Sequence, residues 1–100
     1  MRVIALSTLK ASWKENPDAA DAKEPVLAWY QHTVKADWAS PAEVKADLGH
    51  ASILKDGRVV FNIAGNKYRL VVWINYAYRV VYIRFIGTHA QYDQIDAQTI

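Results

Sequence analysis

Residues 58–87 read RVVFNIAGNKYRLVVWINYAYRVVYIRFIG, and this stretch decides the fold. Apolar residues alternate with polar ones along it, and β-branched and aromatic residues are frequent, as in strands with one buried face. Turn residues occur at Ala64-Gly65-Asn66 and Tyr76-Ala77-Tyr78, and Asp56-Gly57 precedes the stretch. The pattern predicts three strands joined by short loops, which makes them antiparallel neighbours. Their expected ranges are 58–63, 67–75 and 80–87.

Successive side chains on a strand point to opposite sides, so the alternation sorts these strands into two faces. One predicted face is apolar and carries Val59, Phe61, Ile63, Leu70, Val72, Ile74, Val81, Ile83 and Phe85. The other predicted face combines cations, aromatic rings and an amide: Arg58, Val60, Asn62, Lys67, Arg69, Val71, Trp73, Tyr82 and Arg84. We expect helices to cover the apolar face and leave the polar face exposed.

A short strand at Arg2–Leu6 and a first helix are expected at the start of the chain. Ser7 can cap this helix, Leu9 and Trp13 continue its apolar side, and Asn16-Pro17 ends it. The helix therefore has one side that can pack on a sheet.

Two further helices are expected before the first of the three strands. The second begins near Asp18 or at Pro25, and its apolar residues follow at helical spacing: Leu27, Tyr30, Val34 and Trp38. The third is opened by the capping box Ser40-Pro41-Ala42-Glu43 and closes near Gly49. These elements predict one α+β domain, residues 1–100, with N-terminal helices packed on one face of a small, mainly antiparallel sheet.

Composition excludes several kinds of site. The chain has no cysteine, so disulfides, thiolate zinc sites and cysteine nucleophiles are excluded. The apolar run Val3–Leu6 is too short for a signal peptide and no apolar run suits a membrane span, so we expect a cytoplasmic protein. His32, His50 and His89 do not share metal-ligand spacing with nearby carboxylates. We therefore expect no metal and no cofactor.

Basic residues dominate the second half of the chain. Residues 1–50 contain six Lys or Arg and seven Asp or Glu, whereas residues 51–100 contain six and three. Cations gathered on the polar face without neighbouring acids repel one another unless an anion binds there. RNA or an acidic protein segment would serve as that anion. The alternative is that the long side chains lie over apolar neighbours such as Trp73 and keep their charges in water.

His89 follows the last predicted strand, at the rim of the polar face. Histidine changes charge near neutral pH and is therefore suited to proton transfer. Tyr92 lies one helical turn further on, and Asp93 is close enough to orient the imidazole or to cap a short helix. A histidine in this position can also be an ordinary cap or loop residue, so its neighbours are what favour a catalytic role.

Aromatic and lysine side chains extend the candidate surface. Tyr92, Trp73 and Tyr82 can stack on bases, and each can equally be a packing residue. Lys45 and Lys55 are expected to border the surface unless they are simply solvated. The candidate RNA-binding residues are thus Arg58, Asn62, Lys67, Trp73, Tyr82, Lys55 and Lys45.

Two runs of the sequence resemble the HigB toxins of bacterial type II toxin-antitoxin pairs, within the wider RelE group. They are residues 60–70, VFNIAGNKYRL, and residues 82–93, YIRFIGTHAQYD. The resemblance implies a RelE-like fold and an mRNA interferase, that is, an endoribonuclease that enters the ribosomal A site and cuts translated mRNA. It also implies a HigA-type antitoxin with a helix-turn-helix domain, so that DNA is contacted only through the antitoxin.

The resemblance also implies a metal-independent reaction, in which a ribose 2′-hydroxyl attacks the adjacent phosphate. Such a reaction needs a base for the hydroxyl, cations for the phosphate and an acid for the leaving oxygen. Arg69 falls at the position of the group's phosphate-stabilising arginine, His89 where relatives carry an arginine or histidine, and Tyr92 near their functional tyrosine. The choice of base and acid stays open. The hypothesis is that His89 moves a proton while Arg69, with Arg84 or Lys67, neutralises the phosphate.

Other functions fit the same predicted scaffold. One is an RNA-binding module without catalysis, and another is a gyrase-inhibiting toxin of the related ParE type. A third is an inactive or purely structural partner of the antitoxin. A proton-transferring histidine beside phosphate-binding arginines favours the enzyme, because neither a binder nor a gyrase inhibitor has an evident need of it.

Overall fold

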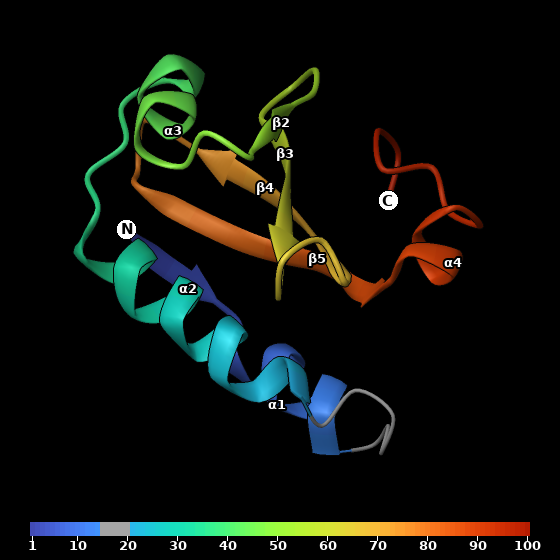
Figure 1. The fold of residues 1–100 in the computed structure, drawn as a ribbon. Helices are drawn as coiled ribbons and strands as arrows, with labels where there is room; N and C mark the ends of the chain where they lie inside the picture. Colours follow the sequence, from blue (N-terminus) through green and yellow to red (C-terminus); the bar gives the residue numbers. More distant parts are fainter. Residues whose placement is uncertain (15–20) are drawn as a thin grey trace.

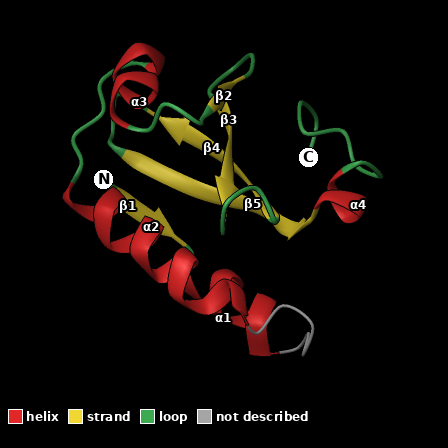
Figure 2. Ribbon diagram, in the orientation of Figure 1, coloured by secondary structure: helices red, strands yellow, loops and turns green. Residues whose placement is uncertain are grey.

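The computed structural model describes residues 1–14 and 21–100. Helices and strands are distinguished in Figure 2. The elements are β1 (Arg2–Ile4), α1 (Leu6–Lys14), α2 (Lys23–Lys35), α3 (Pro41–Asp47), β2 (Ser52–Ile53), β3 (Arg58–Ile63), β4 (Tyr68–Asn75), β5 (Val80–Thr88) and α4 (His89–Tyr92). The three strands predicted from residues 58–87 are confirmed to within one residue at each end.

The strands form one mixed sheet in the order β1-β5-β4-β3-β2. β1 pairs with β5 in parallel, and the other neighbours are antiparallel. The predicted α+β class and mainly antiparallel sheet are therefore confirmed. Figure 1 shows α3 and α4 near opposite ends of β5, so the segment that carries His89 lies away from α3.

The main core forms where α1, α2 and α3 meet one face of the sheet. Phe61 of β3 is fully buried, and the rings of Trp29 and Trp38 lie 5.4 and 6.2 Å from it. Leu9 of α1 and Val44 of α3 are also fully buried in this cluster. Burying a large apolar side chain contributes about 1.5–3 kcal/mol, so these contacts fix the helices on this face.

The predicted apolar side of the second helix is wrong by about one residue. The buried residues of α2 are Val26, Trp29 and Thr33, at helical spacing, whereas Val34 is 38% exposed. The helix ends at Lys35, before Trp38, which is buried from the following loop. Packing of the Trp29 and Trp38 rings on Phe61 sets this orientation.

Helix boundaries differ slightly from the prediction. α1 begins at Leu6, so Ser7 lies within the helix instead of capping it. Ser40 caps α3 as predicted, because its Oγ accepts from the Glu43 backbone N–H at 3.4 Å, but α3 ends at Asp47. The expected helix end at Asn16-Pro17 and the alternative start at Asp18 lie outside the described residues.

A bulge in β5 changes the face on which Phe85 lies. On β4, Val71 pairs with Phe85 and Val72 with Ile83, so Arg84 is an extra residue between them. The bulge moves Phe85 to the second face of the sheet, the one predicted to be polar, where it packs near Val71. The predicted place of Phe85 on the apolar core face is therefore wrong, because strict alternation does not continue past Arg84.

Candidate functional site

One end of the second face is organised by a row of paired residues across three strands. Asn62 of β3 pairs with Arg69 of β4, and Arg69 pairs with Gly87 of β5. A Cβ atom at position 87 would come within 2.5 Å of Gln91 Oε1 and 2.8 Å of Phe85 Cζ. A side chain at position 87 would therefore require the Gln91 and Phe85 side chains to move, so the present contact between β5 and the start of α4 depends on glycine.

Arg69 contacts Tyr92 of α4 across this row. The guanidinium carbon of Arg69 lies 5.6 Å from the centroid of the Tyr92 ring, in a cation–π arrangement. Within residues 1–14 and 21–100, Arg69 forms no ion pair, and its Nε atom is buried without a hydrogen-bond partner. The guanidinium is thus oriented by an aromatic ring, and no acidic side chain of the described residues pairs with its charge.

His89 is the first residue of α4 and is held there by the helix cap. Thr88 Oγ1 accepts from the Gln91 backbone N–H at 3.3 Å, and Gln91 Oε1 accepts from the Thr88 backbone N–H at 2.9 Å. The imidazole Nε2 of His89 lies 3.2 Å from Asn66 Oδ1, in the turn between β3 and β4. The backbone of Asp93 caps the end of α4, so Asn66 is the residue that meets the ring.

Lys67, next to Asn66, is an ion-paired cation. Its Nζ binds the carboxylate of Asp21, which also accepts a hydrogen bond from the Tyr68 hydroxyl. The hydrogen bond from Lys67, together with that from Tyr68, lowers the pKa of Asp21 below its ordinary value. Asp21 thereby ties Lys67 to Tyr68, whose ring is buried in the main core on the helix-covered side; the sequence did not predict this contact.

Arg58, Trp73 and Tyr82 form a second row across the same three strands. The Trp73 and Tyr82 rings stack with centroids 5.1 Å apart, and Trp73 Nε1 donates to the backbone oxygen of Asp56 at 2.8 Å. Trp73 follows Arg69 by four residues on β4, which corresponds to about 13 Å along a strand. The predicted polar residues therefore form two groups at opposite ends of the face.

A second apolar cluster lies between the two rows and is covered by the C-terminal segment. Val60 and Val71 are at most 3% exposed and pack with Ala97, which is itself 8% exposed. Arg58 Nη2 donates to the backbone oxygen of Ile100 at 2.7 Å, and Arg84 Nε lies 3.4 Å from the same atom. The expectation of a fully exposed polar face is therefore wrong. Residues 97–100 cover its centre, and the backbone oxygen of Ile100 accepts from Arg58 and Arg84.

The two remaining candidate lysines also have backbone contacts. Lys45 Nζ donates to the backbone oxygens of Gly49 and Ala51, at 2.7 and 2.6 Å, and so stabilises the end of α3. The backbone N–H and C=O of Lys55 are both bound by the side-chain amide of Gln98, which leaves the Lys55 side chain exposed. The structure brings together Asn62, Lys67, Arg69, His89 and Tyr92, and separates them from Arg58, Trp73, Tyr82 and Lys45.

Comparison with protein-family models matches residues 22–95 to the HigB toxin, described as the RelE-like toxic component of a toxin-antitoxin system. The chain belongs to the HigB toxin family. It is therefore the toxic component of such a system, and an antitoxin is its partner. Comparison with curated proteins gave no match. The matched range of this HigB-family chain includes every residue of the group around Arg69 and His89, and it stops before Ala97.

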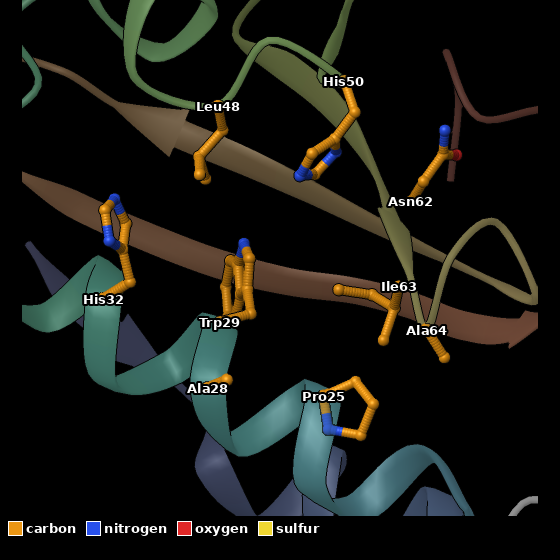
Figure 3. Close-up of a pocket in the computed structure, with 9 residues that line it drawn as sticks. All are labelled: Pro25, Ala28, Trp29, His32, Leu48, His50, Asn62, Ile63 and Ala64. Carbon is orange, nitrogen blue, oxygen red and sulfur yellow. The ribbon is translucent and has the colours of Figure 1, made fainter.

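A pocket of about 270 Å³ lies on the helix-covered side of this HigB-family toxin (Figure 3). It is lined by Pro25, Ala28, Trp29, His32, Leu48, His50, Asn62, Ile63 and Ala64. His32 Nε2 lies 2.8 Å from Asp47 Oδ2, and Trp38 Nε1 donates to the same oxygen at 3.0 Å. The hydrogen bond with His32 lowers the pKa of Asp47, and that from Trp38 acts in the same direction. Asn62 is the residue shared by this pocket and the Arg69 row.

The described part of this HigB-family chain has neither a membrane-spanning helix nor a cluster of metal ligands. No helix within residues 1–14 and 21–100 is long and apolar enough to cross a membrane. In the same residues, no three His, Cys, Asp or Glu side chains are grouped so that they could hold a metal ion.

Asn66 and Asp21 were missed by sequence reasoning for different reasons. Asn66 has φ of 83°, a conformation that asparagine tolerates and that marks turns, so the Ala64-Gly65-Asn66 signal could have pointed to it. Asp21 is far from β4 in the chain, and its contacts with Lys67 and Tyr68 depend on the packing of α2.

Proposed function

We propose that this toxin is a ribosome-dependent endoribonuclease that cleaves translated mRNA. The observation that carries the proposal is the guanidinium of Arg69, which pairs with no acidic side chain of the described residues and is held on the Tyr92 ring at the end of the sheet where His89 begins α4. Guanidinium groups bind phosphate through paired N–H donors, and such bonds are strongest where water is partly excluded. A phosphate is the anion that this arrangement best fits.

The reaction proposed is attack of a ribose 2′-oxygen on the adjacent phosphorus. The new O2′–P bond forms as the P–O5′ bond breaks, which leaves a 2′,3′-cyclic phosphate and a 5′-hydroxyl. Arg69 is proposed to neutralise the charge that grows on the phosphate oxygens, and His89 to take part in proton transfer. Tyr92 orients Arg69 and presents its hydroxyl as a proton donor for the leaving oxygen. No metal is required in this scheme.

RNA is proposed to enter over the row of Asn62, Arg69 and Gly87. Lys67 joins this path by exchanging Asp21 for a phosphate. Trp73 and Tyr82, about 13 Å further along the sheet, would stack with nucleotides beyond the cleavage site. Arg58, Arg84 and Lys55 lie next to the C-terminal segment, so they would contact RNA only at its margin.

The antitoxin is proposed to be of the HigA type, with a helix-turn-helix domain that alone contacts DNA. The ribosome and mRNA, as substrates, place the activity in the cytoplasm. Co-expression with the protein encoded by the neighbouring reading frame tests the pairing. Recovery of the two chains as one complex is the expected result.

The decisive test maps the 5′ ends of a defined message after incubation with translating ribosomes. The wild-type chain is expected to cut the message on the ribosome, whereas His89→Ala is expected to lose at least about 100-fold in rate. Lys10→Ala on the exposed side of α1 is the matched control and should cut at the wild-type rate. RNA binding without cleavage would favour the binding module instead. Inhibition of gyrase supercoiling without cleavage would favour the ParE-like alternative.

A further inference from the structure

We infer that Asn66 is a positioning residue that fixes the tautomer of His89, so that Nδ1 is the atom that accepts a proton. This inference rests on the proposed function for its catalytic meaning. Its geometric basis is the 3.2 Å separation between His89 Nε2 and Asn66 Oδ1. An amide oxygen only accepts hydrogen bonds, so with Oδ1 of Asn66 facing the ring, as in this structure, we assign the hydrogen to Nε2 of His89.

Backbone contacts close the turn that carries Asn66. Ile63 pairs with Tyr68 across the hairpin, and the Lys67 backbone N–H donates to the Ala64 backbone oxygen at 3.2 Å. Asn66 itself has φ of 83°, in the region that asparagine adopts more readily than most residues. The amide oxygen is therefore presented from a fixed point on the hairpin.

The imidazole is held from the other side by the sheet and the cap of α4. Tyr68 pairs with Thr88, which brings the start of β4 next to the last residue of β5. The reciprocal hydrogen bonds between Thr88 and Gln91 then fix the backbone of His89 at the first position of the helix. Asn66 and His89, 23 residues apart in the chain, are thus both fixed in position by backbone contacts. A hydrogen bond between two positioned groups can select one tautomer of the imidazole.

Selection of the tautomer decides what the ring can do. In a neutral imidazole one nitrogen donates and the other accepts. With the hydrogen on Nε2 and directed to Asn66, the lone pair on Nδ1 is free to take the proton of the 2′-hydroxyl as the O2′–P bond forms. The proton for the leaving O5′ comes from a different donor, the hydroxyl of Tyr92 in the reaction proposed for this toxin. Rotation of the ring, which would present the wrong nitrogen, is opposed by the same contact.

The test combines imidazole ¹⁵N spectroscopy with cleavage kinetics. Asn66→Gly removes the amide and keeps the backbone conformation, because glycine adopts positive φ without strain. The chain has three histidines, so the His89 signals are assigned as those missing from His89→Ala. In the wild type the His89 signals should report hydrogen on Nε2, and in Asn66→Gly they should move toward a mixture of tautomers.

Kinetics separate positioning from folding. Asn66→Gly should lower kcat roughly 10- to 100-fold, the range seen when the hydrogen-bond partner of a metal-binding histidine is removed, with KM changed less than about threefold. Asn66→Asp keeps an accepting oxygen, so it should retain the Nε2–H tautomer and most of kcat. Its added negative charge should raise KM for RNA. Melting temperatures of both variants show whether either loss comes from unfolding.

The outcomes distinguish this inference from the proposed function. An unchanged His89 spectrum in Asn66→Gly, or an altered spectrum with unchanged kcat in a folded variant, overturns the positioning role. If the wild type cuts no message while its tautomer still depends on Asn66, the nuclease proposal fails and the assignment of the hydrogen bond stands.

Discussion

The guanidinium carbon of Arg69 lies 5.6 Å from the ring centroid of Tyr92, so that a residue of β4 is oriented by a residue of α4. A contact of this kind contributes about 0.5–1 kcal/mol at exposed sites and more where water is excluded. Arg69 Nε is buried without a hydrogen-bond partner among the described residues. The guanidinium would therefore be positioned by both the Tyr92 ring and the phosphate proposed to bind there.

Arg69→Lys should therefore impair cleavage although the charge is kept. Lysine lacks the planar guanidinium, which can lie over an aromatic ring and donate hydrogen bonds to two phosphate oxygens at once. We expect kcat to fall roughly 100-fold or more, in the range for loss of one transition-state donor. The assay is message cleavage on ribosomes, and Arg2→Lys, at an exposed position of β1, is the control. Wild-type kcat in Arg69→Lys would remove Arg69 from the chemistry.

Asp21→Asn should strengthen RNA binding. The substitution removes the partner charge of Lys67 and frees that lysine for a phosphate. The slope of log affinity against log salt for single-stranded RNA should steepen by about 0.7, the amount for one added phosphate contact. Asp37→Asn, which frees Arg79 away from the site, is the control and should leave the slope unchanged. Equal slopes for wild type and Asp21→Asn would show that Lys67 does not reach the RNA.

Asp47 should stabilise the fold in a pH-dependent way. Its pKa is lowered in the folded chain, so the stabilisation is complete above the unfolded-state pKa of about 3.9 and is lost as pH falls through the lower folded value. Urea unfolding of wild type and Asp47→Asn should therefore differ by a constant amount between about pH 5 and 6, and the difference should shrink as pH falls below the unfolded-state pKa. Asparagine keeps an oxygen for Trp38 Nε1, which isolates the effect of the charge. A difference that does not change with pH would contradict the assignment.

Gly57→Ala should be much more destabilising than Gly49→Ala. Gly57 has φ of +81°, and a Cβ atom there would lie 2.7 Å from the backbone oxygen of Ile74. A Cβ atom at Gly49 would meet no atom within 4 Å, and the φ of Gly49 is not positive. We expect a loss of more than about 1 kcal/mol in the free energy of unfolding for Gly57→Ala and little change for Gly49→Ala. Similar losses in both variants, measured by urea unfolding, would show that backbone strain is not the cause.

Local patterns predicted the elements of this fold well, and contacts distant in sequence limited the rest. The period-two alternation located β3, β4 and β5, and the cap at Ser40 located α3. Alternation could not reveal the bulge at Arg84, because a bulge depends on pairing with β4 and leaves no polar or apolar signal of its own.

The candidate site was also predicted only in part, because some of its contacts join residues that are distant in the sequence. Arg69, His89 and Tyr92 could be named because their strands and their spacing place them near one end of the sheet. Asn66, which meets His89, comes from a turn, and Asp21, which pairs with Lys67, comes from the segment before α2; tertiary packing alone decides these contacts. The packing of Ala97 on the second face could not be predicted either, because the short C-terminal segment has no periodic pattern of apolar residues that would indicate it.

The bulge makes β5 unusually tolerant of shortening at one position. Without Arg84, Ile83 and Phe85 would become consecutive opposite Val72 and Val71, and every later side chain would keep its present orientation. Loss of Ile83 or Phe85 would instead put Arg84 opposite Val72 or Val71, where its charge would face an apolar cluster. Length variants of this toxin should therefore survive at position 84 and fail at its neighbours.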